Sequence, residues 1–179
     1  MQRIPPLTVE NAPEASKPIL ENIKSRLGRI PNIYATAAHS PAALKGLTTL
    51  TSALAGGKLE GIPSEAVSLC VSQEHGCHYC TAAHTALAKR QGATDEQALG
   101  YRQGKADDPK IQALLDFATA VVKNRGQVSD DDVQKAKDAG FAEADLLEAI
   151  GIVVLNTFTN YINALVKTDL DFPKVPKVE

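Results

Sequence analysis

The residue types that favour β-strands are scarce in this sequence. Aromatic residues make up only 4% of the 179 residues, and tryptophan is absent. Strands are enriched in aromatic and β-branched residues, whereas Ala, Leu, Lys, Glu and Gln, which dominate here, favour helices. Segments rich in these residues begin at capping residues or prolines, such as Ser40-Pro41, and end at glycines, such as Gly140. The sequence therefore predicts an all-α bundle of about eight helices.

Length and charge narrow the class of protein further. A chain of 179 residues fits one compact domain, so we predict a single domain over residues 1–179. Prolines near both ends predict extended arms at about residues 1–14 and 170–179. The formal net charge of -2 gives no sign of a nucleic-acid partner or of an anionic membrane surface.

Neither a membrane span nor a secretory signal is visible in the sequence. The longest apolar run, residues 149–155, is far shorter than the roughly 20 residues that cross a bilayer. The N-terminal segment has no apolar stretch after its single arginine, as a secretory signal would. We therefore expect a soluble, cytoplasmic protein.

Two of the three cysteines and three of the four histidines lie within residues 75–84. On a helix, Cys77, Cys80 and His84 share a stripe roughly 60° wide, while His78 and Tyr79 point elsewhere. Unpaired N–H groups and the helix dipole stabilise a thiolate at the start of a helix, so a Cys-x-x-Cys pair there tends to be redox active. We predict a redox core at about residues 62–92.

Glu65 adds a carboxylate to this cluster. The two helices predicted on either side of Gly76 form a hairpin, in which His84 lies nearest to Glu65 along the helix axis, followed by Cys80 and then Cys77. A carboxylate, an imidazole and a thiol in that order suit a proton relay. The helix dipole favours a thiolate at Cys77, whereas proximity to His84 and Glu65 favours one at Cys80. The residues alone leave both assignments open.

The pattern Glu65…Cys77-x-x-Cys80-x-x-x-His84 resembles that of the alkylhydroperoxidase D / carboxymuconolactone decarboxylase family. The resemblance implies an all-α fold of the alkylhydroperoxidase D-like type that assembles as a homo-oligomer, a trimer or a hexamer. It also implies a thiol peroxidase activity. By this resemblance, Cys80 attacks the peroxide and Cys77 resolves the sulfenic acid to a disulfide, while Glu65 and His84 carry protons.

Further segments bear on this resemblance. Lys89-Arg90 and residues 157–161 are also similar to peroxidase-related members. One position departs from the pattern, because Tyr79 stands where the best-studied peroxidase members have a histidine two residues after the first cysteine. The decarboxylase branch does not rely on the thiol pair, so the presence of both cysteines argues against lactone decarboxylation.

The sequence therefore predicts a thiol-dependent peroxidase that reduces hydroperoxides through a Cys77/Cys80 dithiol–disulfide cycle. We expect it to need no metal, flavin or nicotinamide and to take electrons from a partner thiol protein or a small thiol. One alternative is a non-redox, decarboxylase-like enzyme that uses Glu65 and His84 as acid and base on a small organic acid. Another is a non-catalytic oligomer. A zinc site at the cysteines and histidines is disfavoured, because the chain has no second short-spaced ligand pair.

The last predicted helix, residues 143–167, carries apolar residues around much of its surface. This pattern is typical of a central helix or of one at a subunit interface. Asn156, Asn160 and Asn163 follow i, i+4, i+7 spacing and therefore line one face of it. Two interpretations remain open: the asparagines satisfy buried hydrogen-bonding groups, or they line a pocket.

Overall fold

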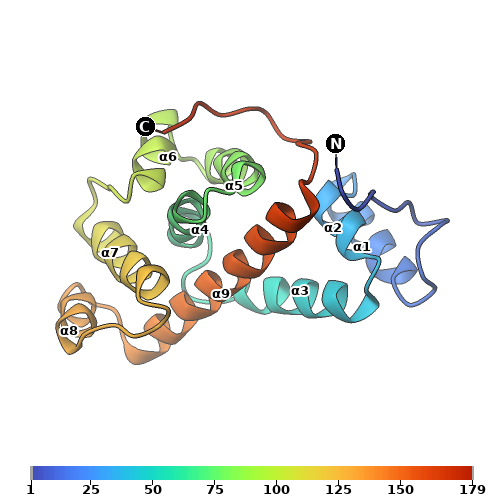
Figure 1. Cartoon of the computed structure of the whole chain (residues 1–179). Helices are drawn as coiled ribbons and strands as arrows, with labels where there is room; N and C mark the ends of the chain where they lie inside the picture. The colour runs from blue at the N-terminus through green and yellow to red at the C-terminus, as the bar shows by residue number, and fades with distance from the viewer. Residues whose placement is uncertain (1, 179) are drawn as a thin grey trace.

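The structure, a computed structural model, describes residues 2–178 and has nine helices in that range (Figure 1). The all-α prediction is confirmed, and no strand occurs within residues 2–178. The helices are α1 (Lys17–Leu27), α2 (Asn32–Ala37), α3 (Pro41–Leu54), α4 (Ile62–Glu74), α5 (His78–Arg90), α6 (Asp95–Arg102), α7 (Pro109–Lys123), α8 (Asp130–Asp138) and α9 (Glu143–Val166).

Helix α4 lies at the centre of the molecule and packs against α5, α6, α7 and α9 (Figure 1). Seven consecutive residues of α4, 66–72, are buried. Val67 and Val71 pack in one apolar cluster with Leu114 and Ile152, whereas Leu69 packs in a second cluster around the other side. A helix covered on all sides holds its side chains rigidly, which makes α4 a firm support for the residues that it presents.

Helix α9 is long and apolar enough to cross a membrane by length and composition, which the short apolar run in the sequence did not suggest. About three fifths of that apolar window is not buried, since 39% of it is buried inside the molecule. Its inward face, however, carries Asn156, Asn160 and Asn163 and packs against α3, α4, α5 and α7. We therefore interpret α9 as a core helix of the bundle.

Both ends of the chain lie as extended segments on the helical body. The backbone N–H of Arg3 donates to the carbonyl of Val166 at 2.7 Å. The C-terminal segment runs from the end of α9 over α5 to α6 (Figure 1). On its way, Asp171 accepts a hydrogen bond from the backbone N–H of Asn32, and the Pro176 carbonyl accepts one from Arg102.

The loop between α3 and α4 is held by one carboxylate of α9. The side chain of Glu148 accepts hydrogen bonds from the backbone N–H groups of Lys58 and Leu59, at 3.1 and 2.7 Å. The carboxylate lies so close to Gly57 that a Cβ atom at that position would collide with it. The close approach of loop and carboxylate therefore requires glycine at position 57.

Replacing Glu148 with alanine is expected to lower the free energy of unfolding by about 2 kcal/mol, because it leaves two loop N–H groups without their acceptor. Urea denaturation followed by circular dichroism measures the change. Glu96→Ala, at an exposed position in the first turn of α6, is the matched control and should change the midpoint less. Equal effects of the two substitutions would contradict the bracing role of Glu148.

Candidate active site

The α4–α5 hairpin brings the two site cysteines to the start of α5. Helix α4 ends at Glu74, with His75 as its C-cap, and Gly76 turns the chain with a φ of 64°, a conformation that glycine adopts without strain. Cys77 is the N-cap of α5, and its sulfur accepts a hydrogen bond from the backbone N–H of Cys80 at 3.3 Å. Cys77 thus takes the place that a serine or aspartate side chain commonly fills.

The sulfur atoms of Cys77 and Cys80 are in direct contact. Both are buried, reduced thiol groups, and the Cys77 thiol donates a hydrogen bond to the Cys80 sulfur at 2.8 Å. The side-chain amide of Asn163 donates a second hydrogen bond to the Cys80 sulfur at 3.1 Å. The sulfur of Cys80 therefore receives two donors from opposite sides of the site.

These contacts separate the pKa values of the two thiols. The hydrogen bond from Cys77, the positive charge of His84 and the amide of Asn163 hold the pKa of Cys80 well below its usual range. The neighbouring Cys80 sulfur and burial raise the pKa of Cys77. These shifts favour the thiolate form of Cys80 and the neutral thiol form of Cys77. The geometry favours the second of the two thiolate assignments that the sequence left open.

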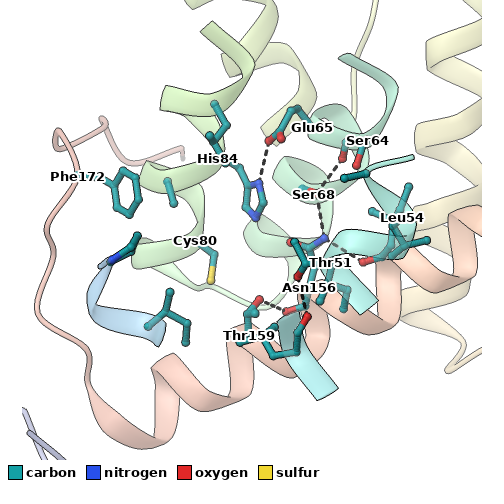
Figure 2. A pocket seen from close by; sticks show the side chains of 18 of the residues that line it. Thr51, Leu54, Ser64, Glu65, Ser68, Cys80, His84, Asn156, Thr159 and Phe172 are labelled. Atoms are coloured by element: carbon teal, nitrogen blue, oxygen red, sulfur yellow. Dashed lines mark hydrogen bonds and ion pairs between the residues drawn. The ribbon is translucent and has the colours of Figure 1, made fainter. Parts of the chain in front are cut away.

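Glu65 and His84 form the second pair of the site (Figure 2). Glu65 lies in the first turn of α4, and its carboxylate accepts a hydrogen bond from Nδ1 of His84 at 2.8 Å. The two side chains are only 16% and 22% exposed. Burial opposes a charge on the imidazole, but the Glu65 carboxylate outweighs it, so the pKa of His84 is raised above its ordinary value. The carboxylate of Glu65 thus favours the protonated form of His84, whose positive charge in turn favours the thiolate of Cys80.

A cavity of about 430 Å³ opens in front of these groups. Cys80, Glu65 and His84 line it, and Figure 2 shows the three side chains directed toward the same space. Of the two site cysteines in the described chain, only Cys80 lines the cavity. The rest of the wall is mostly apolar and comes from distant segments; its larger apolar residues are Leu27, Ile33, Leu47, Leu54, Leu87, Ile152, Leu155 and Phe172.

Tyr79, His78 and His75, which the sequence also singled out, lie outside this hydrogen-bonded group. Tyr79 is buried against the cysteines and Phe172, and its hydroxyl accepts from the backbone N–H of Ile33 at 3.4 Å. His78 is exposed, and His75 contacts Thr157 at 3.1 Å on the surface of α9. No group of three metal-ligating side chains occurs within residues 2–178.

The three asparagines of α9 fulfil both interpretations offered by the sequence, since some line the cavity and some satisfy buried hydrogen-bonding groups. Asn156 and Asn163 line the cavity, whereas Asn160 donates to the hydroxyl of Ser72 at 3.4 Å. Their regular spacing predicted that the three asparagines share one face of the helix. It did not indicate which of them contacts the sulfur of Cys80. Arg29, in the loop between α1 and α2, and Phe172, in the C-terminal segment, also line the cavity. No pattern in the sequence indicated that either residue belongs to the site.

The low pKa of Cys80 predicts a pH profile for its reactivity. Because the pKa of Cys80 is lowered to about 6, the residue should be alkylated by iodoacetamide at nearly its full rate at pH 7 and lose reactivity as the pH falls below 6. Mass spectrometry of the reduced protein after timed alkylation measures each cysteine separately. Cys70 serves as the internal control, because burial raises its pKa. A Cys80 profile with the alkaline midpoint of a free thiol would contradict the prediction.

Comparisons with known proteins match part of the chain to a protein family and most of it to solved structures. Residues 41–102 match the model of the carboxymuconolactone decarboxylase family. This segment runs from α3 to α6 and contains Glu65, Cys77, Cys80 and His84. No curated protein sequence matches the chain at a significant level.

Solved structures share the fold over nearly the whole chain. One is described as an alkylhydroperoxidase AhpD core and an uncharacterized peroxidase-related protein from Ralstonia eutropha JMP134; it is 23% identical, covers 95% of this chain and 92% of its own, and has a TM-score of 0.86. A peroxidase-related protein from Silicibacter sp. TM1040 is 19% identical, with 91% and 88% coverage and a TM-score of 0.80.

A third structure is the debrominase Bmp8, with a C82A substitution and in complex with 2,3,4-tribromopyrrole. It is 19% identical, with 94% and 91% coverage and a TM-score of 0.78. Identities this low establish a common fold and no more. Residues 41–102 are thus similar to the carboxymuconolactone decarboxylase family, and the chain has the all-α fold of these alkylhydroperoxidase-like, peroxidase-related structures.

Proposed function

We propose that this protein is a thiol-dependent peroxidase that reduces organic hydroperoxides through Cys80 and Cys77. One observation carries the proposal: the sulfur of Cys80 faces the cavity, and the thiol of Cys77 lies 2.8 Å behind it and donates a hydrogen bond to it, which lowers the pKa of Cys80. A thiolate is the nucleophile in thiol chemistry, and a neighbouring thiol converts its oxidised form to a disulfide.

The proposed reaction has two steps. The Cys80 thiolate attacks the terminal oxygen of the hydroperoxide, the O–O bond breaks, and the products are a sulfenic acid on Cys80 and an alkoxide. Cys77 then attacks the sulfur of that sulfenic acid, which releases water and forms the Cys77–Cys80 disulfide. An external thiol supplies the two electrons that restore the dithiol.

His84 and Glu65 supply the proton that the leaving group requires. The alkoxide takes a proton from the imidazolium of His84, which faces the same cavity. Glu65 orients the imidazole through Nδ1 and stabilises its positive charge, so that the other ring nitrogen is free to donate.

The apolar wall of the cavity supports an organic hydroperoxide as the substrate. A volume of about 430 Å³ falls within the range of small-molecule sites, roughly 300–1,000 Å³. Hydrogen peroxide alone would leave most of this apolar surface in contact with water. We therefore propose that an alkyl or aryl hydroperoxide reacts faster than hydrogen peroxide.

We also propose a homo-oligomer, a trimer or a hexamer, in the cytoplasm. Helix α9 exposes Leu147, Val154, Tyr161 and Leu165. Exposed apolar side chains of this size on one helix are typical of an interface with a second subunit. The source of electrons is proposed to be a thiol protein or a small thiol.

The decisive experiment is anaerobic reaction of the fully reduced protein with an organic hydroperoxide and with hydrogen peroxide. Loss of peroxide is followed in time, and peptide mass spectrometry detects the Cys77–Cys80 bridge. Rapid loss with one bridge per chain is expected. Thiols that react no faster than free cysteine would overturn the proposal. Activity on a small organic acid that survives serine at both Cys77 and Cys80 would instead support the decarboxylase-like alternative.

Reductive debromination is a second candidate, favoured by the shared fold with the debrominase Bmp8 and by a cavity large enough for an aromatic ring. In this reaction the dithiol would be oxidised to the disulfide while a carbon–bromine bond is replaced by carbon–hydrogen and hydrogen bromide is released. Bromide release from 2,3,4-tribromopyrrole, measured with the reduced protein, tests it. Bromide formation without any reaction with hydroperoxides would favour this function over the first.

A further inference from the structure

The three asparagines on the inward face of α9 are almost fully buried, with exposed fractions of 2% for Asn156, 1% for Asn160 and 5% for Asn163. The hydrogen bonds of Asn156 connect helices and satisfy its own amide group. Its amide nitrogen donates to the Ser68 hydroxyl and to the Ile152 carbonyl, both at 2.9 Å. It ties α9 to α4 and satisfies its own donor groups at the same time.

The hydrogen bonds of Asn163 differ from those of Asn156. Its amide nitrogen donates to the Cys80 sulfur at 3.1 Å, and its carbonyl oxygen accepts no hydrogen bond from any group within residues 2–178. A buried polar atom without a partner is costly, because the desolvation of that atom is not compensated. An apolar side chain of similar size would avoid this cost, so packing alone does not account for an amide at position 163.

The position of Asn163 indicates what the amide does. It lines the cavity beside Cys80, and it approaches the sulfur from α9, whereas Cys77 approaches from the start of α5. In the proposed reaction Cys77 must give up its own proton when it attacks the sulfenic acid, so its hydrogen bond serves only the first step. The Asn163 amide does not titrate and has no such second task.

We propose that Asn163 is a catalytic residue of this site, whose amide N–H donates to the Cys80 sulfur and holds that sulfur as an anion facing the cavity. The inference rests on the thiol chemistry proposed for Cys80 and adds a residue on α9 to the pattern Glu65, Cys77, Cys80 and His84. A hydrogen bond to a charged group is stronger than one between neutral groups, so the contact favours the thiolate over the thiol.

The test compares Asn163→Leu and Asn163→Asp with the wild-type protein. Iodoacetamide alkylation of Cys80 in the reduced protein, from pH 4 to pH 9, gives the midpoint of thiolate formation without any peroxide. In Asn163→Leu the midpoint should rise by about one pH unit, which lowers the thiolate fraction about tenfold at pH values below the midpoint. Asn163→Asp should raise it further, because a carboxylate repels the thiolate.

Thermal unfolding separates this role from a structural one. Asn163→Leu removes a buried oxygen that lacks a partner, so its melting temperature should not fall, although its alkylation midpoint rises. Thr157→Val, on the same helix but in contact with His75, is the matched control and should leave the midpoint unchanged. A midpoint that stays at the wild-type value in both Asn163 variants would overturn the proposal.

The outcome also distinguishes this inference from the proposed function. If the wild-type protein is inert to hydroperoxides while Asn163→Leu still raises the midpoint, the peroxidase proposal fails and Asn163 retains its effect on Cys80. If the wild-type protein consumes hydroperoxides and Asn163→Leu does so at the same rate with the same midpoint, the peroxidase proposal stands and Asn163 has no catalytic role.

Discussion

Replacing Cys80 with serine is expected to lower the rate of hydroperoxide consumption by at least about a thousandfold, because a serine hydroxyl is not ionised at neutral pH and is a poor nucleophile there. Replacing Cys77 with serine should have a different outcome. The Cys80 thiolate remains, so the variant should consume one equivalent of peroxide and stop at the sulfenic acid. Peroxide consumption and a sulfenic-acid probe read by mass spectrometry measure the two effects.

The third cysteine supplies the control for this experiment. Cys70 lies on α4 outside the cavity and contacts the hydroxyl of Thr119 at 3.1 Å. Cys70→Ser should retain peroxide consumption close to the wild-type rate if the variant has the wild-type circular dichroism spectrum. A sulfenic acid trapped on Cys77 in the Cys80→Ser variant would reverse the assignment of the attacking and the resolving cysteine.

Replacing Glu65 with glutamine is expected to lower the rate of peroxide consumption at pH 7 by roughly a hundredfold, the lower end of the range for a lost acid–base group. The variant keeps the shape of the side chain but removes its charge. The pKa of His84, which the carboxylate raises, should then fall, so that a smaller fraction of the imidazole is protonated at pH 7. The leaving alkoxide loses its proton donor, and Cys80 loses the positive charge that favours its thiolate.

The sign of the pH dependence makes this prediction specific. In the wild-type protein the raised pKa of His84 extends protonation of the imidazole to higher pH, and protonation is lost as the pH rises through that pKa. In Glu65→Gln this loss should occur at lower pH, so the activity maximum should narrow from its alkaline side. Glu96→Gln, an exposed change in the first turn of α6, is the control and should keep the wild-type profile. An unchanged profile in Glu65→Gln would contradict the relay.

Much of the fold was predictable because helix ends are local features of the sequence. Gly28, Gly76 and Gly140 all adopt positive φ at or near the ends of helices, as glycine at such positions predicts. Ser129 and Asp132 form the reciprocal hydrogen bonds that begin α8. These interactions join residues within a few positions of one another, so they do not depend on how the rest of the chain packs.

The contact between Glu65 and His84 could also be predicted from the sequence. The two residues lie 19 positions apart on the two arms of one hairpin, whose turn is set by Gly76. The rise per residue of a helix is constant, so the relative heights of residues on the two arms follow from counting. The long apolar helix was predicted over residues 143–167 and is observed as Glu143–Val166, because its apolar residues recur along its whole length.

The all-α class, the positions of most helix ends and the hairpin that carries Glu65, Cys77, Cys80 and His84 could be predicted from the sequence, because they depend on short-range geometry. The cysteine that faces the cavity could be identified only from the packing of the helices. Asn163 reaches the Cys80 sulfur across 83 positions of sequence, and Phe172 closes the cavity from the C-terminal segment. Such contacts result from the packing of α9 and the chain end against α4 and α5, and helical periodicity does not specify which side chains meet there.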